Sequence, residues 1–330
     1  MKPAIAVIGC GGIGSRHLQA LGKLAIDADV FAVDLSTEAT NQAGQFFLES
    51  KKVAGSPAAL HRAHDLSALP ARLDVAIVAT QASARLGAMS ALLSGRSIGH
   101  LVLEKFLFAR RHDFDAARRL LVDERMRVWV NCPRRIYPGY RAIAEQLSDS
   151  TFVSLHVSGG ARSAPLGTIG IHFADLLDFL SVSDSATLKA TLHSATLVPA
   201  NRNLQDFGGT LEMSSSDGRS RLRYEAIAAT DAPHLVSIVS DRAQFIVRER
   251  EQVVQAATSA EQWRSSSMPF PVPYQSELTN LVVAELLSSG SCGLTPYARS
   301  AAVHATLFDV LIDAYRTLRN DAYIEELPFT

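Results

Sequence analysis

The first two dozen residues constrain the fold more than any other part of the chain. An aliphatic run, Ala4 to Ile8, leads into the loop Gly9-Cys10-Gly11-Gly12-Ile13-Gly14, and an amphipathic segment, Ile13 to Leu24, follows. The loop fits the pattern G-x-G-x-x-G, whose glycines permit a tight turn and close approach of a pyrophosphate to the backbone. A helix that starts there directs free N–H groups and its positive dipole end at phosphate. The sequence therefore predicts a βα unit that binds a dinucleotide.

Asp34 lies about twenty residues beyond this loop, at the end of the next apolar run. A carboxylate in that place accepts hydrogen bonds from both ribose hydroxyls of NAD and repels the 2′-phosphate of NADP. No Lys or Arg occurs between Asp34 and Lys51, although Arg16 could supply a phosphate clamp. We therefore expect NAD, with NADP less favoured. The alternative is a plain glycine turn followed by a solvated strand end.

The pattern up to residue 131 alternates short aliphatic runs with amphipathic segments, which is typical of repeated βα units. Expected strands are Ala4 to Ile8, Val30 to Val33, Val75 to Ala79, Ile98 to Leu103 and Val128 to Val130. Expected helices are Ile13 to Leu24, Thr37 to Leu48, Ala84 to Leu93 and Asp113 to Asp123. Nearly continuous apolar strands suit a parallel sheet covered on both faces. Residues 1–131 are therefore predicted to form a doubly wound α/β domain of the Rossmann type.

Residues 132–330 have a different pattern, which predicts an α+β domain with a largely antiparallel sheet. Expected helices are Tyr140 to Leu147, Ile171 to Leu180, Glu277 to Ser288 and Arg299 to Arg319. Expected strands are Phe152 to Val157, Gly209 to Met213, Arg221 to Ile227, Leu235 to Val239 and Ala243 to Val247. Ser216-Asp217-Gly218 and Asp231-Ala232-Pro233 indicate hairpins, and Ser265 to Pro273 indicates a surface loop.

Composition excludes several classes of function. The chain has 330 residues, with 32 Lys plus Arg against 33 Asp plus Glu, so its charge of −1 offers no attraction for nucleic acid or an anionic membrane. The three cysteines, Cys10, Cys132 and Cys292, fit reduced thiols and a cytoplasmic protein. No apolar run approaches the roughly 20 residues that span a bilayer. Zinc spacings, a G-x-S-x-G elbow and a Walker lysine are also missing from the sequence, so we expect no metal site.

Four motifs resemble those of the Gfo/Idh/MocA family of sugar and inositol dehydrogenases. They are Gly9 to His17, Ala79-Thr80-Gln81, Leu103-Glu104-Lys105-Phe106, and Gly170-Ile171-His172-Phe173-Ala174-Asp175. The resemblance implies that Thr80, Gln81, Glu104 and Lys105 lie beside the cofactor, that Lys105 is the active-site lysine, and that His172 faces the substrate. It also implies a second domain with an open mixed sheet, whose outer face forms a homo-oligomer, a dimer or a tetramer.

Three positions depart from the family pattern. Phe106 stands where the family usually has a proline, Thr168 where many members carry an aspartate, and Arg85 where a histidine is common. We therefore expect the proton relay of this chain to be built differently from that of the family.

The chemistry of these residue types suits oxidation of an alcohol. His172 can take the hydroxyl proton near neutral pH, and Asp175, one helical turn later, can orient its ring. Lys105, at the carboxyl end of a parallel strand, can stabilise a developing alkoxide. The alternatives are that His172 packs within its helix while Asp175 is solvated, and that Lys105 is a surface lysine paired with Glu104.

The segment around Arg134, Arg135 and Tyr137 lies at the expected domain junction. Two arginines there can hold a carboxylate, a phosphate or sugar hydroxyls, so we expect these three residues, with Thr168 and His172, to bind substrate. The alternative is that the arginines are surface charges and the tyrosines pack between domains.

These observations together predict an NAD-dependent oxidoreductase that acts on a secondary alcohol or ketone of a sugar, a nucleotide-linked or acidic sugar derivative, or a cyclitol. The second hypothesis is a dinucleotide-binding sensor that has the fold without turnover. A third, reduction of an imine or a conjugated system, uses the same site.

Overall fold

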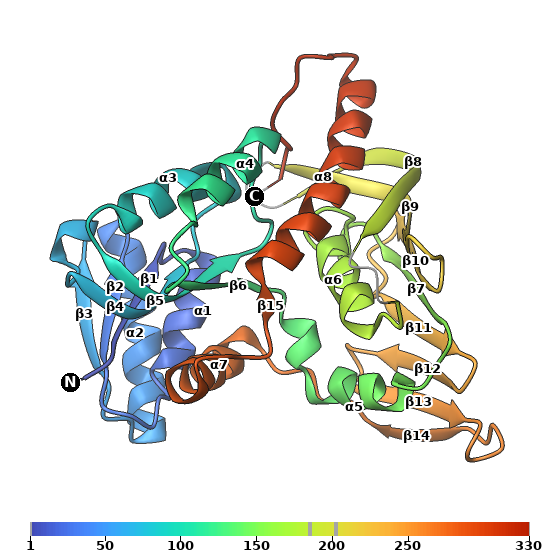
Figure 1. Ribbon diagram of the computed structural model, residues 1–330, viewed down its shortest axis with the longest axis horizontal. Helices are drawn as coiled ribbons and strands as arrows, with labels where there is room; N and C mark the ends of the chain where they lie inside the picture. The colour runs from blue at the N-terminus through green and yellow to red at the C-terminus, as the bar shows by residue number, and fades with distance from the viewer. Residues whose placement is uncertain (1, 184–186, 201–203, 330) are drawn as a thin grey trace. The chain divides into compact units, whose positions relative to one another are not determined.

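The computed structural model describes residues 2–183, 187–200 and 204–329 (Figure 1). The chain divides into two compact units. The first comprises Met1–Phe108, His112–Pro133 and Pro273–Tyr297, and the second comprises Ala109–Arg111, Arg134–Val272 and Ala298–Thr330.

The first unit is built on a seven-stranded sheet in the order β15-β6-β5-β4-β1-β2-β3. Its strands are β1 Ala4–Ile8, β2 Asp29–Val33, β3 Ala59–Ala63, β4 Arg72–Val78, β5 Ser97–Glu104, β6 Arg127–Asn131 and β15 Thr295–Pro296. All paired neighbours from β1 to β6 are parallel, and β15 alone runs antiparallel, to β6. The predicted doubly wound α/β architecture is thereby confirmed.

Helices cover both faces of this sheet, which explains why its central strands are almost entirely apolar. In Figure 1, α3 and α4 lie on one face, and α1, α2 and α7 lie on the other. Their bounds are α1 Gly12–Leu21, α2 Thr37–Ala54, α3 Ala82–Leu93, α4 Arg111–Leu120 and α7 Gln275–Ser289, with a 3₁₀ turn at Leu66–Ala68.

The sequence places a domain boundary after residue 131, whereas the first unit also contains Pro273–Tyr297. The physical reason is that this late segment returns to the first sheet. Its helix α7 packs against α1, and Thr295 pairs with Val130 of β6. Strand β3 was not predicted either, because His61 and Arg62 are exposed at the sheet edge and interrupt the apolar pattern.

The second unit is built on an eight-stranded sheet in the order β14-β13-β12-β11-β7-β10-β9-β8. The strands are β7 Val153–Gly160, β8 Leu188–Pro199, β9 Gln205–Ser215, β10 Ser220–Ile227, β11 Leu235–Ser240, β12 Ala243–Arg248, β13 Val253–Thr258 and β14 Ser266–Pro269. Only β7 and β10 pair in parallel, so the sheet is mixed and largely antiparallel, as predicted. Buried and exposed side chains alternate along β7 and β10.

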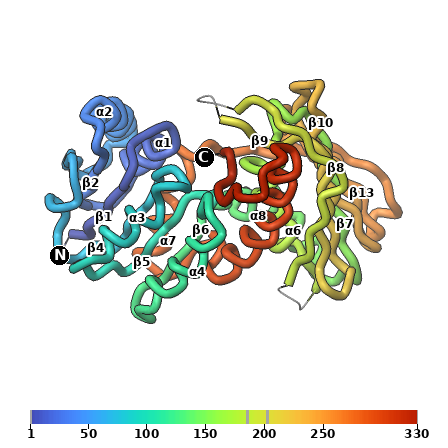
Figure 2. The backbone as a smooth tube through the Cα atoms, turned by 90° about the horizontal axis from the view of Figure 1, so that it is seen from above, coloured from blue at the N-terminus to red at the C-terminus, as the bar shows by residue number. Residues whose placement is uncertain are grey.

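Three helices and a short turn belong to this part of the chain. They are α5 Pro138–Leu147, α6 Gly170–Leu180 and α8 Tyr297–Arg319, and the 3₁₀ turn is Pro133–Ile136. Figure 2 shows α6 and α8 on the same side of the sheet. Within the described ranges, no helix is long and apolar enough to cross a membrane.

Two local predictions for the second unit were wrong. Asp231-Ala232-Pro233 does not close a hairpin, because β7 lies between β10 and β11 in the sheet. The expected loop Ser265 to Pro273 contains β14, whose exposed polar residues resemble a loop because the strand lies at the sheet edge. The hairpin at Ser216-Asp217-Gly218 is confirmed by the antiparallel pairing of β9 with β10.

Candidate active site

The glycine loop after β1 is shaped as a dinucleotide cradle requires. Gly9 has φ +91°, and a Cβ added there would lie 2.9 Å from the backbone nitrogen of Thr80. A Cβ on Gly14 would contact the carbonyl oxygen of Gly9. Gly11, Gly12 and Ile13 are exposed, and no side chain caps the start of α1 at Gly11. The backbone therefore offers open N–H groups where a pyrophosphate would bind.

Asp34 lies beside this loop at the end of β2. Its Oδ2 accepts a hydrogen bond from the Cys10 N–H at 2.7 Å, and its Oδ1 accepts one from the Ser36 N–H at 2.8 Å. Each carboxylate oxygen keeps a lone pair for a further donor such as a ribose hydroxyl. Arg16, the alternative phosphate clamp, donates a hydrogen bond to Gln19 at the protein surface.

Lys105 follows the last residue of β5 and is half-buried, whereas Glu104 is buried with internal partners. The Glu104 Oε1 atom bonds to His17 Nε2 at 2.9 Å and accepts from Asn131 Nδ2 at 2.5 Å. Glu104 is therefore not a surface carboxylate, as the alternative interpretation of this dipeptide required, although the charge of Lys105 acts on it. The structure also gives the Glu104 carboxylate, expected beside the cofactor, two protein partners.

Helix α7 completes the polar network around Glu104. Thr279 Oγ1 lies 2.8 Å from His17 Nδ1, and Gln275 bonds to both Thr279 and Asn131 at 2.9 Å. Burial acts to raise the pKa of Glu104, but the hydrogen bond and charge of His17, the charge of Lys105 and the Asn131 hydrogen bond outweigh it. The pKa of Glu104 is therefore below its ordinary value, and the carboxylate is ionised at neutral pH.

Arg85 on α3 binds the backbone on both sides of the site. It donates to the carbonyl oxygens of Phe106 and Leu107, directly after Lys105, and to that of Thr80 in the predicted nicotinamide loop. Burial lowers its pKa to about 10, so the guanidinium stays charged at neutral pH. The Lys105–Phe106 peptide bond is cis. Gln81, exposed, precedes α3 as its N-cap residue.

The sequence noted Arg85 only as a departure from the family pattern. The signal that could have identified its role is a single arginine among the small and apolar residues Ala82 to Leu93, because a buried guanidinium needs several acceptors nearby.

His172 lies in the second unit, on α6, and is buried with Asp175. Asp175 is not solvated: its Oδ2 accepts from Arg135 Nε at 2.9 Å. Arg135 Nη2 also donates to Asp178 at 3.1 Å, and Arg299 Nε donates to Asp178 at 2.7 Å. Two guanidiniums thus bind two carboxylates of the helix that carries His172.

Arg134 is likewise buried, so the interpretation of the two arginines as surface charges is wrong. Its Nε and Nη2 donate to the two oxygens of Glu249, each at 2.8 Å. Tyr140 donates to the same carboxylate at 2.7 Å, and His234 Nε2 lies 2.9 Å from it. Tyr137 is buried and stacks on Tyr140. The Arg134 guanidinium is committed to Glu249, which leaves it poorly suited to hold substrate.

Thr168 precedes α6, and its N–H and hydroxyl both donate to Asp206 Oδ2, at 3.0 and 2.8 Å. Sequence reasoning missed Asp206 because its partners lie 39 and 38 residues earlier. The first unit thus brings together the glycine loop, Asp34, Thr80 and Lys105, while Thr168, His172 and Asp175 belong to the second.

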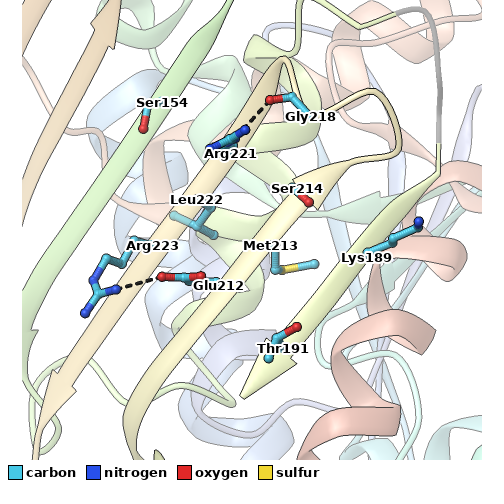
Figure 3. Close-up of a pocket in the computed structure, with 10 residues that line it drawn as sticks. All are labelled: Ser154, Lys189, Thr191, Glu212, Met213, Ser214, Gly218, Arg221, Leu222 and Arg223. Carbon is cyan, nitrogen blue, oxygen red and sulfur yellow. Dashed lines mark hydrogen bonds and ion pairs between the residues drawn. The ribbon is translucent and has the colours of Figure 1, made fainter. Parts of the chain in front are cut away.

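A hollow of about 480 Å³ lies on the face of the second sheet formed by β7 to β10 (Figure 3). None of the predicted site residues lines it; Lys189, Glu212, Arg221 and Arg223 do. In the described residues, no group of three or more His, Cys, Asp or Glu side chains is arranged to hold a metal ion.

Comparison by sequence finds no matching protein-family model and no matching curated protein. Comparison by structure finds the same fold along nearly the whole chain. UDP-N-acetylglucosamine 3-dehydrogenase GnnA from Acidithiobacillus ferrooxidans matches with a TM-score of 0.69 at 14% identity, covering 94% of this chain and 97% of that one.

Two further structures are similar to this chain to the same degree. KijD10, a 3-ketoreductase from Actinomadura kijaniata in complex with TDP-benzene and NADP, matches with a TM-score of 0.66 at 17% identity, covering 94% of this chain and 96% of its own. A super-repressor mutant of Gal80p from Saccharomyces cerevisiae matches with a TM-score of 0.68 at 10% identity, covering 97% and 96%. These matches confirm the fold that we expected from the Gfo/Idh/MocA resemblance. The three structures are a dehydrogenase, a ketoreductase and a super-repressor mutant.

Proposed function

We propose that this chain is an NAD(P)-dependent oxidoreductase of the Gfo/Idh/MocA type that interconverts a secondary alcohol and a ketone on a sugar or cyclitol. The observation that carries this proposal is the placement of Lys105. Lys105 directly follows β5. It comes after Glu104, which belongs to the buried polar network, and before Phe106 and Leu107, whose carbonyl oxygens Arg85 binds. The glycine loop and Asp34 follow other strands of the same sheet. Ligands of open α/β sheets bind at the carboxyl ends of the strands, where these residues lie.

Oxidation of a secondary alcohol removes a hydride from the carbon and a proton from the oxygen. The bound nicotinamide dinucleotide supplies the hydride acceptor, or the donor in the reverse direction. His172 takes the hydroxyl proton as general base and returns it in reduction. The Lys105 ammonium binds the substrate oxygen and stabilises the alkoxide as that proton leaves. Asp175 and Asp178, on the same helix as His172, accept hydrogen bonds from Arg135 and so fix it against that helix.

The cofactor preference follows from Asp34. Its carboxylate is fixed by two backbone N–H groups where the adenosine ribose would lie, and like charge disfavours a 2′-phosphate beside it. We therefore propose NAD as the better cofactor, although the similar KijD10 structure contains NADP.

The substrate class follows the two enzymes that share the fold. GnnA is described as a dehydrogenase of UDP-N-acetylglucosamine, and KijD10 as a 3-ketoreductase bound to TDP-benzene. We therefore place nucleotide-linked sugars first among the candidate substrates, before acidic sugars and cyclitols.

The test is steady-state kinetics with NAD and NADP across a panel of nucleotide sugars, acidic sugars and inositols. With a substrate that the wild type oxidises, Lys105→Ala and His172→Ala should each lower kcat by roughly 10² to 10⁴. Turnover near the wild-type rate in both variants would defeat the assignment of roles.

A regulatory protein is the second candidate, because the repressor Gal80p shares this fold over 97% of the chain. Dinucleotide binding without NADH formation on every member of the panel would favour it.

We also propose a cytoplasmic homo-oligomer that associates through the outer face of the second sheet, where His156, Glu212 and Arg223 are partly exposed. Light scattering of the purified protein measures its oligomeric state.

A further inference from the structure

Asp206 is a buried carboxylate that the proposed chemistry does not use. It is 0% exposed near the start of β9. Its Oδ1 accepts from the N–H groups of Gly167 and Phe207 at 2.8 and 2.7 Å. Its Oδ2 accepts from the N–H and hydroxyl of Thr168. Four donors point at the two oxygens, which is the number that an ionised carboxylate accepts.

No lysine, arginine or histidine among the described residues forms an ion pair with Asp206. Burial raises its pKa, against the lowering effect of the hydrogen bonds from Thr168, Phe207 and Gly167. A buried carboxylate without a counter-charge is costly unless its hydrogen bonds are all made. The four hydrogen bonds of Asp206 therefore tie Gly167, Thr168 and Phe207 to one buried carboxylate.

The partners of Asp206 form the loop that leads into the helix of His172. Leu166 N–H donates to the Phe207 carbonyl at 2.8 Å, so the loop is tied to β9 at that end as well. Helix α6 begins at Gly170, and His172 N–H donates to the Ile169 carbonyl at 3.0 Å. The backbone position of His172 thus depends on a loop that β9 fixes.

A second segment, Glu326–Phe329, covers the same loop. Phe329 is buried, and a Cβ added to Gly167 would contact its ring and the Asp206 carboxylate. The segment is held in turn by a hydrogen bond from Gln205 N–H to the Pro328 carbonyl at 3.3 Å. Gly167 is therefore enclosed between Asp206 and Phe329, with no room for a larger side chain.

We propose that Asp206 is a positioning residue for the reaction: it fixes the loop from Leu166 to Ile169 and thereby the place of His172. This inference rests on the proposed function of His172. It assigns Asp206 no contact with substrate.

The test is Asp206→Asn, measured with the substrate found in the panel. The amide NH₂ presents a donor to groups that are themselves donors, so at least one loop N–H loses its acceptor. Hydrogen exchange in the peptide that contains Gly167 and Thr168 should become about tenfold faster. We expect kcat to fall roughly 10- to 100-fold, as for a displaced catalytic group, with the dissociation constant of the dinucleotide unchanged.

Asp241→Asn is the matched control. Asp241 accepts from the N–H and hydroxyl of Thr151 at 3.0 and 2.9 Å, which repeats the Asp206–Thr168 pattern at an exposed turn. Its kcat should stay within about twofold of the wild type, since the broken bonds are of the same kind and lie outside the loop.

A faster-exchanging loop with wild-type kcat in Asp206→Asn overturns the inference while the proposed function stands. If that variant does not fold, Phe329→Leu loosens the same loop without touching a charge. It should speed exchange there and lower kcat about three- to tenfold; wild-type values of both overturn the inference. If the wild-type protein oxidises no substrate, the proposed function and this inference both fail. The absence of NADH in the wild-type assay distinguishes this outcome from failure of the inference alone.

Discussion

The two units bury charge in different ways. In the first unit, Arg85 binds three carbonyl oxygens and Glu104 binds His17 and Asn131, so each charge meets polar partners around Lys105. In the second unit, the charges near α6 are mostly paired. Arg134 pairs with Glu249, Arg135 with Asp175, and Asp178 with Arg299.

This difference teaches what each set of charges does. A charge bonded to backbone groups fixes the path of a loop, as Arg85 does for the residues that follow Lys105. Paired charges neutralise each other and fix side chains from distant segments against one helix. Removing one charged residue should therefore lower the unfolding free energy for a different reason in each unit. Mutations can separate the two reasons.

The largest effect is expected from breaking a buried pair in the second unit. Arg134→Met leaves the Glu249 carboxylate buried with Tyr140 and His234 but without its bidentate partner. An uncompensated buried charge costs about 3–5 kcal/mol of unfolding free energy. Urea unfolding followed by circular dichroism measures the change.

The double variant Arg134→Met/Glu249→Leu is the control for that pair. Removing both charges should recover a large part of the loss, because well-packed apolar side chains replace a buried pair at little cost. If the double variant is less stable than Arg134→Met alone, the cost comes from packing around Phe173 and the pairing argument is wrong.

A smaller loss, about 3 kcal/mol, is expected from Arg85→Met in the first unit. No opposite charge is left uncompensated there, but three carbonyl oxygens lose their donor at about 1 kcal/mol each. Because two of these carbonyls follow Lys105, kcat should fall as well, by roughly 10-fold or more. Unfolding and steady-state kinetics on one preparation measure both.

Arg96→Met is its matched control. Arg96 donates to a single carbonyl, that of Leu66, so the same substitution should cost about 1 kcal/mol and leave kcat unchanged. Equal losses in both variants would contradict the clamp that we assign to Arg85.

The sequence predicted the site residues of the first unit better than the buried charge pairs of the second. The glycine loop, Asp34, and the Glu104-Lys105 dipeptide are short motifs whose meaning is local, and the apolar strands of a parallel sheet stand out as continuous runs. The sequence singled out Arg85 as a departure from the family pattern but did not show its role, because its acceptors Phe106 and Leu107 lie 21 and 22 residues away.

The buried polar contacts of the second unit join residues far apart in the sequence, and no local pattern predicts them. Arg134 and Glu249 are 115 residues apart, and Asp206 meets Thr168 across 38 residues. The turn Asp231-Ala232-Pro233 illustrates the same point, since turn residues show that the chain reverses but not which strand becomes its neighbour. Mutual recognition of distant polar groups is decided by tertiary packing, which a single sequence does not display.

The pairing also predicts a response to acid. Burial acts to raise the pKa of Glu249, but the charge and hydrogen bond of Arg134 and the hydrogen bond of His234 outweigh it and hold this pKa below its ordinary value. The unfolded chain therefore binds the proton first, at a pKa of about 4.3. The stability from Glu249 is complete above that pH and is lost as pH falls through the lower folded pKa.

Glu249→Gln should remove this dependence. Below about pH 4.3, the unfolding free energy of the wild type should fall more steeply than that of the variant, by up to about 1.4 kcal/mol per pH unit. Urea unfolding at several acidic pH values measures the two slopes, with exposed Glu251→Gln as control. Parallel slopes in the wild type and Glu249→Gln would show that the pair does not control this carboxyl.

The smallest effect is expected where charges pair at the surface of the second sheet. Arg223 bonds to Glu212 at 2.7 Å and to Glu225 at 2.8 Å, much the geometry of the buried pairs, but its side chain is 50% exposed. Water screens such pairs, so Arg223→Ala should cost less than about 1 kcal/mol. That loss should shrink further in 1 M salt, whereas the loss in Arg134→Met should persist. A cost for Arg223→Ala near that of Arg134→Met would mean that water does not reach this face of the sheet, as in an oligomer that buries it.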